Sequence, residues 1–272
     1  MTSPLQELRP APWLPLVRQL TELVPGWVIW KNAEAAFAGS GDVDSAASSS
    51  DWPEISRTFQ GWASDNDFGP VIECRHPPRT MFLVAVREQH DLVELDVLGR
   101  KYFRGGTLFT AEGLVPLSRN DPRGFRVLRP GAQGLILLLG NGVRWGGRPN
   151  PDGLKRRRVA ELLSEDREGV DLAARRFGLP VSLVRRIAAA VSRGGWDRGS
   201  LLLLEAWALL KALGDPLTLL RRGKFRLLSK KRCPVLRAIF YDDRQLPADV
   251  EGWLANVRKT HVVRDVGLQV AP

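Results

Sequence analysis

Residues 92–98 read Leu92-Val93-Glu94-Leu95-Asp96-Val97-Leu98, a period-two alternation that predicts a β-strand. The three odd-numbered side chains are apolar and are expected to pack against a core, whereas Glu94 and Asp96 share the opposite face. Residues 42–44, Asp42-Val43-Asp44, repeat this arrangement on a second short strand. If the two strands are neighbours at about 4.8 Å, three or four carboxylates gather on one face of a sheet.

Further strand and helix patterns surround these two strands. Apolar, β-rich runs occur at residues 27–30, 71–74 and 80–86. Helices are expected at residues 4–24 from the spacing of apolar residues, at residues 33–38 from their alanine content, and at residues 52–64 from the cap Asp51 and from Pro53. Strands with a few helices among them predict an α+β domain with a mixed β-sheet over residues 1–130.

Helical patterns dominate after about residue 130. Residues 131–272 are therefore expected to form a basic α-helical domain. Its expected helices begin at Pro130-Gly131 and continue with residues 154–164, 167–177, 181–193, 200–213 and 248–259.

The two parts of the chain differ in charge. Residues 1–100 hold 8 Lys and Arg against 14 Asp and Glu, residues 101–272 hold 32 against 16, and the net charge is +10. A basic surface favours polyanions, so nucleic acid is a partner that the second part allows, above all through the basic run 221–232 with its interleaved Phe225. The alternative is a solvated face in a chain whose basic residues are mostly Arg.

Composition argues against several classes of protein. Two cysteines, Cys74 and Cys233, exclude a disulfide scaffold, and three scattered histidines lack the spacing of a zinc site. The longest apolar stretch, near residues 201–210, is interrupted by Glu205 and is too short to span a membrane. The first 18 residues lack the features of a secretory signal, so we expect a cytoplasmic protein without a membrane partner.

The acidic cluster suggests a magnesium site. Carboxylates at such short separation repel one another, and divalent cations relieve that repulsion. Mg²⁺ prefers oxygen ligands and typically binds one or two carboxylates together with substrate phosphate. Two such ions, about 4 Å apart, could activate a hydroxyl group and stabilise a pyrophosphate leaving group. The turn Gly39-Ser40-Gly41 offers backbone N–H groups to a triphosphate.

Asp42-Val43-Asp44 after a Gly-Ser turn, followed by Leu95-Asp96-Val97, resembles the nucleotidyltransferase superfamily of DNA polymerase beta type. Trp30-Lys31-Asn32 is similar to a strand end in bacterial nucleotidyltransferase-like proteins with a helical C-terminal half, and so are residues 93–104 and 123–128. The resemblance covers roughly residues 26–140. It implies a nucleotidyltransferase-like α+β domain.

The same resemblance implies the residue roles. Asp42 and Asp44 would bind metal, and Asp96 would be the third carboxylate and the base, so these three are the expected catalytic residues. Gly39 and Ser40 would contact the phosphates.

Basic residues near the acidic strands complete the expected nucleotide site. The Gly-Ser turn abuts the acidic pair instead of preceding it by about ten residues, so Lys31-Asn32 is an alternative phosphate contact. Arg100, Lys101 and Arg104 follow the second acidic strand closely and could reach the triphosphate.

The implied reaction transfers a nucleoside monophosphate from an NTP, the co-substrate, to an unknown acceptor and releases pyrophosphate. Two Mg²⁺ ions are the expected cofactor, and the acceptor is a hydroxyl or phosphate group on a small molecule or a macromolecule.

Two alternatives remain open. One is a protein of the same fold that binds nucleotide or RNA without turnover, because Ser45 stands where the superfamily usually has an apolar residue and the Gly-Ser turn abuts the acidic pair. The other is a basic helical protein that binds nucleic acid, in which the acidic strand residues are surface groups.

Overall fold

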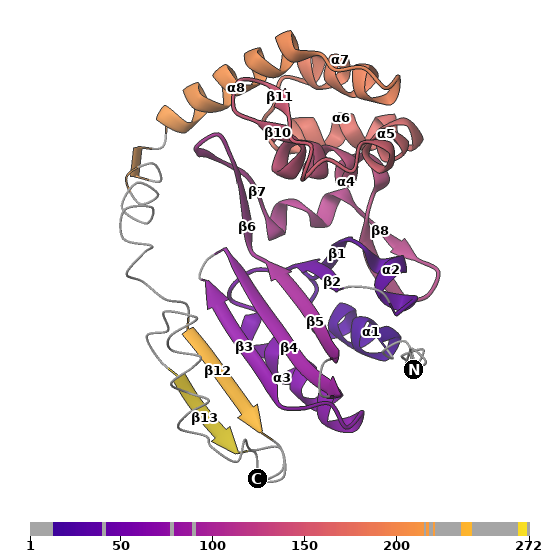
Figure 1. Ribbon diagram of the computed structural model, residues 1–272, viewed down its shortest axis with the longest axis vertical. Coiled ribbons are helices and arrows are strands. Elements are labelled where there is room, and N and C mark those ends of the chain that lie inside the picture. Colours follow the sequence, from indigo (N-terminus) through magenta and orange to yellow (C-terminus); the bar gives the residue numbers. More distant parts are fainter. Residues whose placement is uncertain are drawn as a thin grey trace, which may run out of the picture. The chain divides into compact units, whose positions relative to one another are not determined.

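The chain forms two compact units in the computed structural model, which describes residues 13–39, 42–76, 79–88, 91–214, 216–217, 220, 235–240 and 266–270 (Figure 1). The first unit comprises Met1–Leu98, Asp121–Phe125 and Cys233–Pro272. The second comprises Gly99–Asn120 and Arg126–Arg232.

The first unit is built on a mixed sheet with the strand order β13-β12-β3-β4-β5-β2-β1, which continues to β9 and β8. Pairs β2–β5 and β12–β13 are parallel, whereas β1–β2, β3–β4, β4–β5 and β12–β3 are antiparallel. The strands are β1 (Val28–Lys31), β2 (Val43–Ala46), β3 (Val71–His76), β4 (Thr80–Glu88), β5 (Asp91–Leu98), β8 (Ser118–Asp121), β9 (Phe125–Leu128), β12 (Val235–Phe240) and β13 (Val266–Val270).

Helices cover one face of this sheet. The helices of the unit are α1 (Trp13–Leu23), α2 (Ala33–Phe37) and α3 (Trp52–Asp65), and α3 packs on β3 and β4 (Figure 1). The rings of Trp13 and Trp62 stack at 4.9 Å between their centroids, which joins α1 to α3. Leu83 and Leu95 are fully buried on this face, and their neighbours along β4 and β5 are only partly buried on the other. The sheet therefore presents one half-exposed face, as expected for a sheet that is packed on one side.

In the ranges that the structure describes, the second unit combines helices with small β-hairpins. The helices are α4 (Pro130–Leu137), α5 (Arg156–Glu165), α6 (Arg167–Arg176), α7 (Val181–Ser192) and α8 (Arg198–Leu213), and the hairpins are β6 (Arg100–Phe103) with β7 (Gly106–Thr110) and β10 (Val143–Arg144) with β11 (Arg148–Pro149). Asp166 caps α6 by accepting a hydrogen bond from the Gly169 N–H at 2.9 Å. Gly131 lies where α4 approaches α6 so closely that a Cβ atom would stand 2.0 Å from the Asp166 carbonyl oxygen. Only glycine fits at that position.

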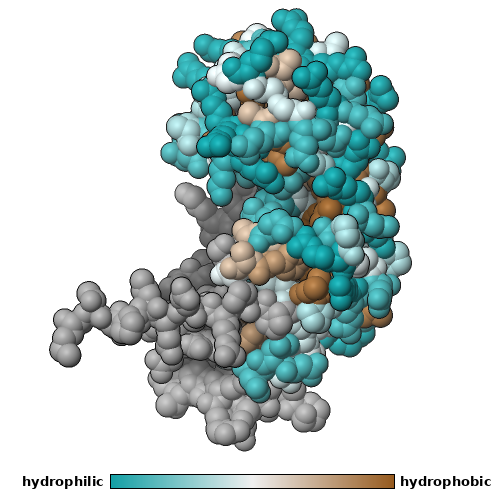
Figure 2. All heavy atoms as spheres, turned by 90° about the vertical axis from the view of Figure 1, so that its right-hand side faces the viewer, coloured by the Kyte–Doolittle hydropathy of each residue, from teal (hydrophilic) through white to brown (hydrophobic). Residues whose placement is uncertain are grey.

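Hydrophilic side chains predominate on the face shown in Figure 2, and hydrophobic ones form small patches there. Within the described ranges, no helix combines the length and the apolar character that crossing a bilayer requires.

The mixed α/β architecture with a mixed sheet agrees with the expected α+β class. The expected α-helical domain over residues 131–272 is corrected in its last part, because β12 and β13 lie in the sheet of the first unit. In its sequence, the β12 segment is rich in β-branched and apolar residues, and its backbone pairs with the edge of β3. The helix expected at residues 248–259 and the basic run 221–232 lie outside the described residues, as does most of the first half of the helix expected at residues 4–24.

Candidate functional site

The pairing of β2 with β5 brings three carboxylates together. The two strands are parallel, and Asp44 and Asp96 are partners in their register. Partners in a parallel pair point to the same face, and Asp42 shares that face because it lies two residues before Asp44. One carboxylate oxygen from each of Asp42, Asp44 and Asp96 lies within 4.8 Å of the others. The cluster therefore stands on the half-exposed face of the sheet.

Asp44 is the most deeply buried member of the cluster, with 2% of its side chain exposed. The ammonium group of Lys31 lies 2.6 Å from its Oδ1, and the Asn32 side-chain amide donates a hydrogen bond to Oδ2 at 2.8 Å. Burial raises the pKa of Asp44 to about 6, and the contacts with Lys31 oppose that rise. Asn32 has φ 62°, a left-handed conformation that asparagine tolerates, and it starts α2 directly after β1. The turn from strand to helix thus aims both side chains at Asp44.

Asp96 lies among like charges. Burial and then the nearby carboxylates of Glu94, Asp44 and Asp42 raise its pKa to about 8. Burial and the charge of Asp42 likewise raise the pKa of Glu94. The Oδ1 atom of Asp96 is buried and has no hydrogen-bond partner within the described part of the chain. Such an atom is costly to leave unsatisfied, since its solvation by water has been lost.

These features fit a divalent cation. The donors are carboxylate oxygens, which Mg²⁺ prefers, and one from each residue lies within 4.8 Å of the others. A bound cation would satisfy the buried Asp96 Oδ1 atom and lower the pKa values that burial and repulsion raise. Asp42, Asp44 and Asp96 are the residues that would hold it.

Ser45 supports the cluster from the other face of the sheet. Its side chain is fully buried, and its hydroxyl group donates a hydrogen bond to the Asp96 backbone carbonyl at 2.8 Å. An apolar residue is usual at this position in the nucleotidyltransferase superfamily that the sequence resembles. The serine of this chain instead links β2 to β5 through its hydrogen bond. It thereby supports the register that places Asp44 beside Asp96.

The expected phosphate-binding turn is described only in part. Gly39 is exposed at the end of α2 with φ 81°, and its N–H donates to the Ala36 carbonyl at 3.0 Å. Ser40 and Gly41 lie outside the described residues. The phosphate contact of Gly39 and Ser40 stays a prediction.

The basic residues that follow β5 belong to the second unit. Arg100 begins β6 and is half-buried opposite Thr110. Arg104 lies in the turn of the β6–β7 hairpin with φ 45°, and its guanidinium group binds Glu205 of α8, with Nε to Oε1 at 2.8 Å. Its Nη2 also donates to the Val143 carbonyl at 3.1 Å. This nearly buried pair holds the hairpin on α8, and no local sequence pattern indicated Glu205 as the partner because 101 positions separate the two residues.

The pKa shifts predict how stability depends on pH in metal-free buffer. In the unfolded chain the carboxyl groups of Asp44 and Asp96 have pKa values near 3.8, whereas in the folded chain the values are about 6 and about 8. Between pH 3.8 and the pKa of the folded state, each of these groups binds more protons in the folded chain than in the unfolded chain. The free energy of unfolding therefore falls as pH rises toward about 6 for Asp44 and about 8 for Asp96. We expect a loss on the order of a few kcal/mol, seen as a falling thermal midpoint from about pH 5 to about pH 9. A midpoint that rises over this range would contradict the assigned shifts.

Comparisons of the chain with protein-family models, with curated proteins and with solved structures found no match, so the functional conclusion rests on the geometry of the carboxylate cluster.

Proposed function

We propose that the protein is a Mg²⁺-dependent nucleotidyltransferase that moves a nucleoside monophosphate from an NTP to a hydroxyl or phosphate acceptor. In this proposal the first unit has a nucleotidyltransferase-like fold. The observation that carries it is the convergence of Asp42, Asp44 and Asp96 on one sheet face, where a buried oxygen of Asp96 has no hydrogen-bond partner in the described ranges.

Each residue of the cluster then has a task in the reaction. Asp42, Asp44 and Asp96 hold the cations, and Asp96 also accepts the proton of the acceptor hydroxyl. Burial and the neighbouring carboxylates raise the pKa of Asp96 to about 8 without metal, and a bound cation would lower it toward neutral pH, where a base is most effective. Lys31 is suited to bind a phosphate oxygen once a cation takes over its place beside Asp44. When bound, Mg²⁺ supplies the positive charge that stabilises the phosphoryl and pyrophosphate oxygens.

The direct test incubates the full chain with each NTP, labelled at the α-phosphate, together with Mg²⁺ and a cell extract. We expect label to appear on an acceptor in the presence of one of the NTPs, and to be absent when EDTA is added or when Asp44→Asn replaces the wild type. Asp65→Asn is the matched control, because Asp65 is an exposed carboxylate at the end of α3. Label transfer that is equal in wild type and Asp44→Asn would refute the proposal.

A second function, nucleotide binding without turnover, is favoured by one contact. The Lys31 ammonium group already lies 2.6 Å from Asp44 and supplies positive charge to the cluster. If that ammonium group permanently replaces a cation, the site binds nucleotide without the metal that transfer requires. The Lys31→Met variant separates the two functions.

A further inference from the structure

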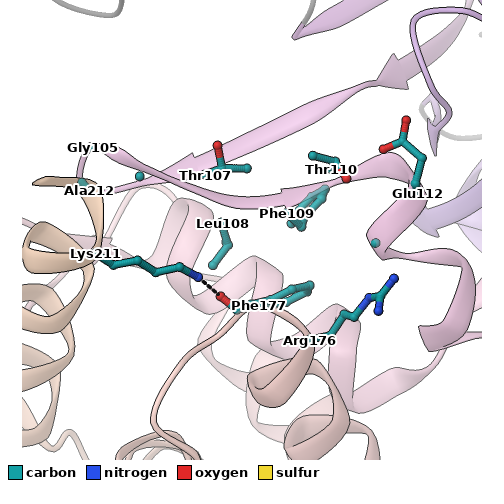
Figure 3. Close-up of a pocket in the computed structure, with 12 residues that line it drawn as sticks. Gly105, Thr107, Leu108, Phe109, Thr110, Glu112, Arg176, Phe177, Lys211 and Ala212 are labelled. Carbon is teal, nitrogen blue, oxygen red and sulfur yellow. Dashed lines mark hydrogen bonds between the residues drawn. The ribbon is translucent and has the colours of Figure 1, made fainter. Parts of the chain in front are cut away.

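The second unit contains a cavity of about 390 Å³ that the proposed transfer does not use (Figure 3). Strand β7 and the short turn that follows it form one wall, and the C-terminal ends of α6 and α8 form the other. Sites for small organic ligands commonly have volumes of about 300–1,000 Å³. The cavity is therefore large enough for a compact ligand with one ring.

The centre of the cavity is apolar and aromatic. Leu108 and Phe109 come from β7 and Phe177 from the end of α6, and all three are almost fully buried. The rings of Phe109 and Phe177 lie 5.6 Å apart between centroids with an interplanar angle of 32°. The two rings pack against each other, and they make this part of the cavity wall aromatic.

Two cations line the same cavity. Lys211 reaches from α8 and donates one hydrogen bond to the Phe177 carbonyl at 2.8 Å, which fixes its ammonium group at the wall and leaves two N–H donors. Arg176 reaches from α6 on the other side of Phe177 (Figure 3). Glu112 also lines the cavity, but Figure 3 shows its carboxylate turned away from the two cations.

Some arginines of the second unit are neutralised by carboxylates, whereas these two cations are not neutralised by any described residue. In the second unit, Arg104, Arg129 and Arg185 each bind a carboxylate. Across the described residues, by contrast, neither Arg176 nor Lys211 forms an ion pair with one, and Arg176 forms no hydrogen bond either. The cavity wall is aromatic, and no described carboxylate neutralises its two cations. Such a cavity suits a ligand that carries both a ring and a negative charge.

We propose that this cavity binds a small organic anion, in which a ring carries a carboxylate or phosphate group. The ring packs against Phe109 and Phe177, and the acidic group is bound by Lys211 and Arg176. This site is independent of the carboxylate cluster and of the proposed transfer reaction.

The test titrates the ¹⁵N-labelled full chain with benzoate and with phenyl phosphate, and follows backbone amide shifts. We expect both probes to shift amides in residues 106–113 and 176–178 at millimolar concentration. The probe that binds more tightly shows whether the site prefers a carboxylate or a phosphate group. Benzyl alcohol lacks the charge and inorganic phosphate lacks the ring, so neither should reproduce the shifts. Because the buffer holds no Mg²⁺ and no nucleotide, failure here leaves the transfer proposal unaffected.

Charge-removing variants locate the binding group. Arg176→Gln and Lys211→Met should each weaken binding about ten-fold, since each removes a charge-assisted hydrogen bond. Arg175→Gln is the matched control, because Arg175 is the adjacent exposed arginine of α6 and does not line the cavity. The thermal midpoint of each variant shows whether it is folded. Because Arg176 is exposed, Arg176→Gln should fold normally, and it tests the proposal even if Lys211→Met does not fold. Absence of shifts with both probes, or shifts that Arg176→Gln leaves unchanged, would overturn the proposal.

Discussion

Asp96→Asn is expected to abolish nucleotidyl transfer while it stabilises the metal-free protein. The substitution removes the proposed base and one metal ligand, so transfer should fall by about 10³-fold or more. It also removes one charge from a cluster in which like charges and burial raise the pKa of Asp96 to about 8. The thermal midpoint in EDTA at about pH 9 should therefore rise by several degrees above that of the wild type.

The pH and metal dependence of this variant give the decisive comparison. At about pH 5 the wild-type Asp96 is protonated and neutral, so the stability difference between variant and wild type should shrink there. Added Mg²⁺ should raise the thermal midpoint of the wild type and of Asp65→Asn, but not that of Asp96→Asn. An Asp96→Asn protein that still transfers label and still responds to Mg²⁺ would show that this carboxylate is neither base nor ligand.

Lys31→Met is expected to make the stability of the protein dependent on Mg²⁺. Asp44 is 2% exposed, and without the ammonium group at 2.6 Å it keeps, among its contacts with described residues, the hydrogen bond from Asn32. Removing one partner of such a buried pair costs on the order of 3 kcal/mol of stability in metal-free buffer near neutral pH. Millimolar Mg²⁺ should restore most of that loss, and half-saturation should need less Mg²⁺ than in the wild type, because the competing ammonium group is gone.

Thermal unfolding with increasing Mg²⁺ measures this effect, with Lys31→Arg as the control that keeps the charge. If Mg²⁺ stabilises Lys31→Met but not the wild type, Lys31 permanently takes the place of a cation, and binding without turnover is the better account. If Mg²⁺ stabilises neither protein, the cluster is not a metal site, and the proposed function fails with it.

Local periodicity was sufficient for the faces of individual strands. The alternation through β5 indicates that Glu94 and Asp96 share a face opposite to a buried apolar one, and burial in the structure follows that alternation. The same rule places Asp42 and Asp44 on one side of β2. These conclusions need only the two-residue period of an extended backbone.

Long-range pairing lay beyond such reasoning. That β2 lies beside β5 in parallel, with Asp44 level with Asp96, depends on strands 52 positions apart in the chain, and many pairings are compatible with the same local patterns. For the same reason the late strands β12 and β13 were expected to be part of a helical domain, although they extend the sheet beyond β3.

The chemistry of the amino acids alone thus establishes an α+β chain with a short acidic strand pair and an arginine-rich second part, because periodicity, charge and composition are local properties. Only the folded chain determines which charges meet. It pairs Arg104 with Glu205 and places Lys31 against Asp44, and it leaves Asp96 Oδ1 buried without a partner among the residues that the structure describes. Burial and proximity in space raise the pKa of Asp96 and create the site, and both arise from contacts between residues that are distant in sequence.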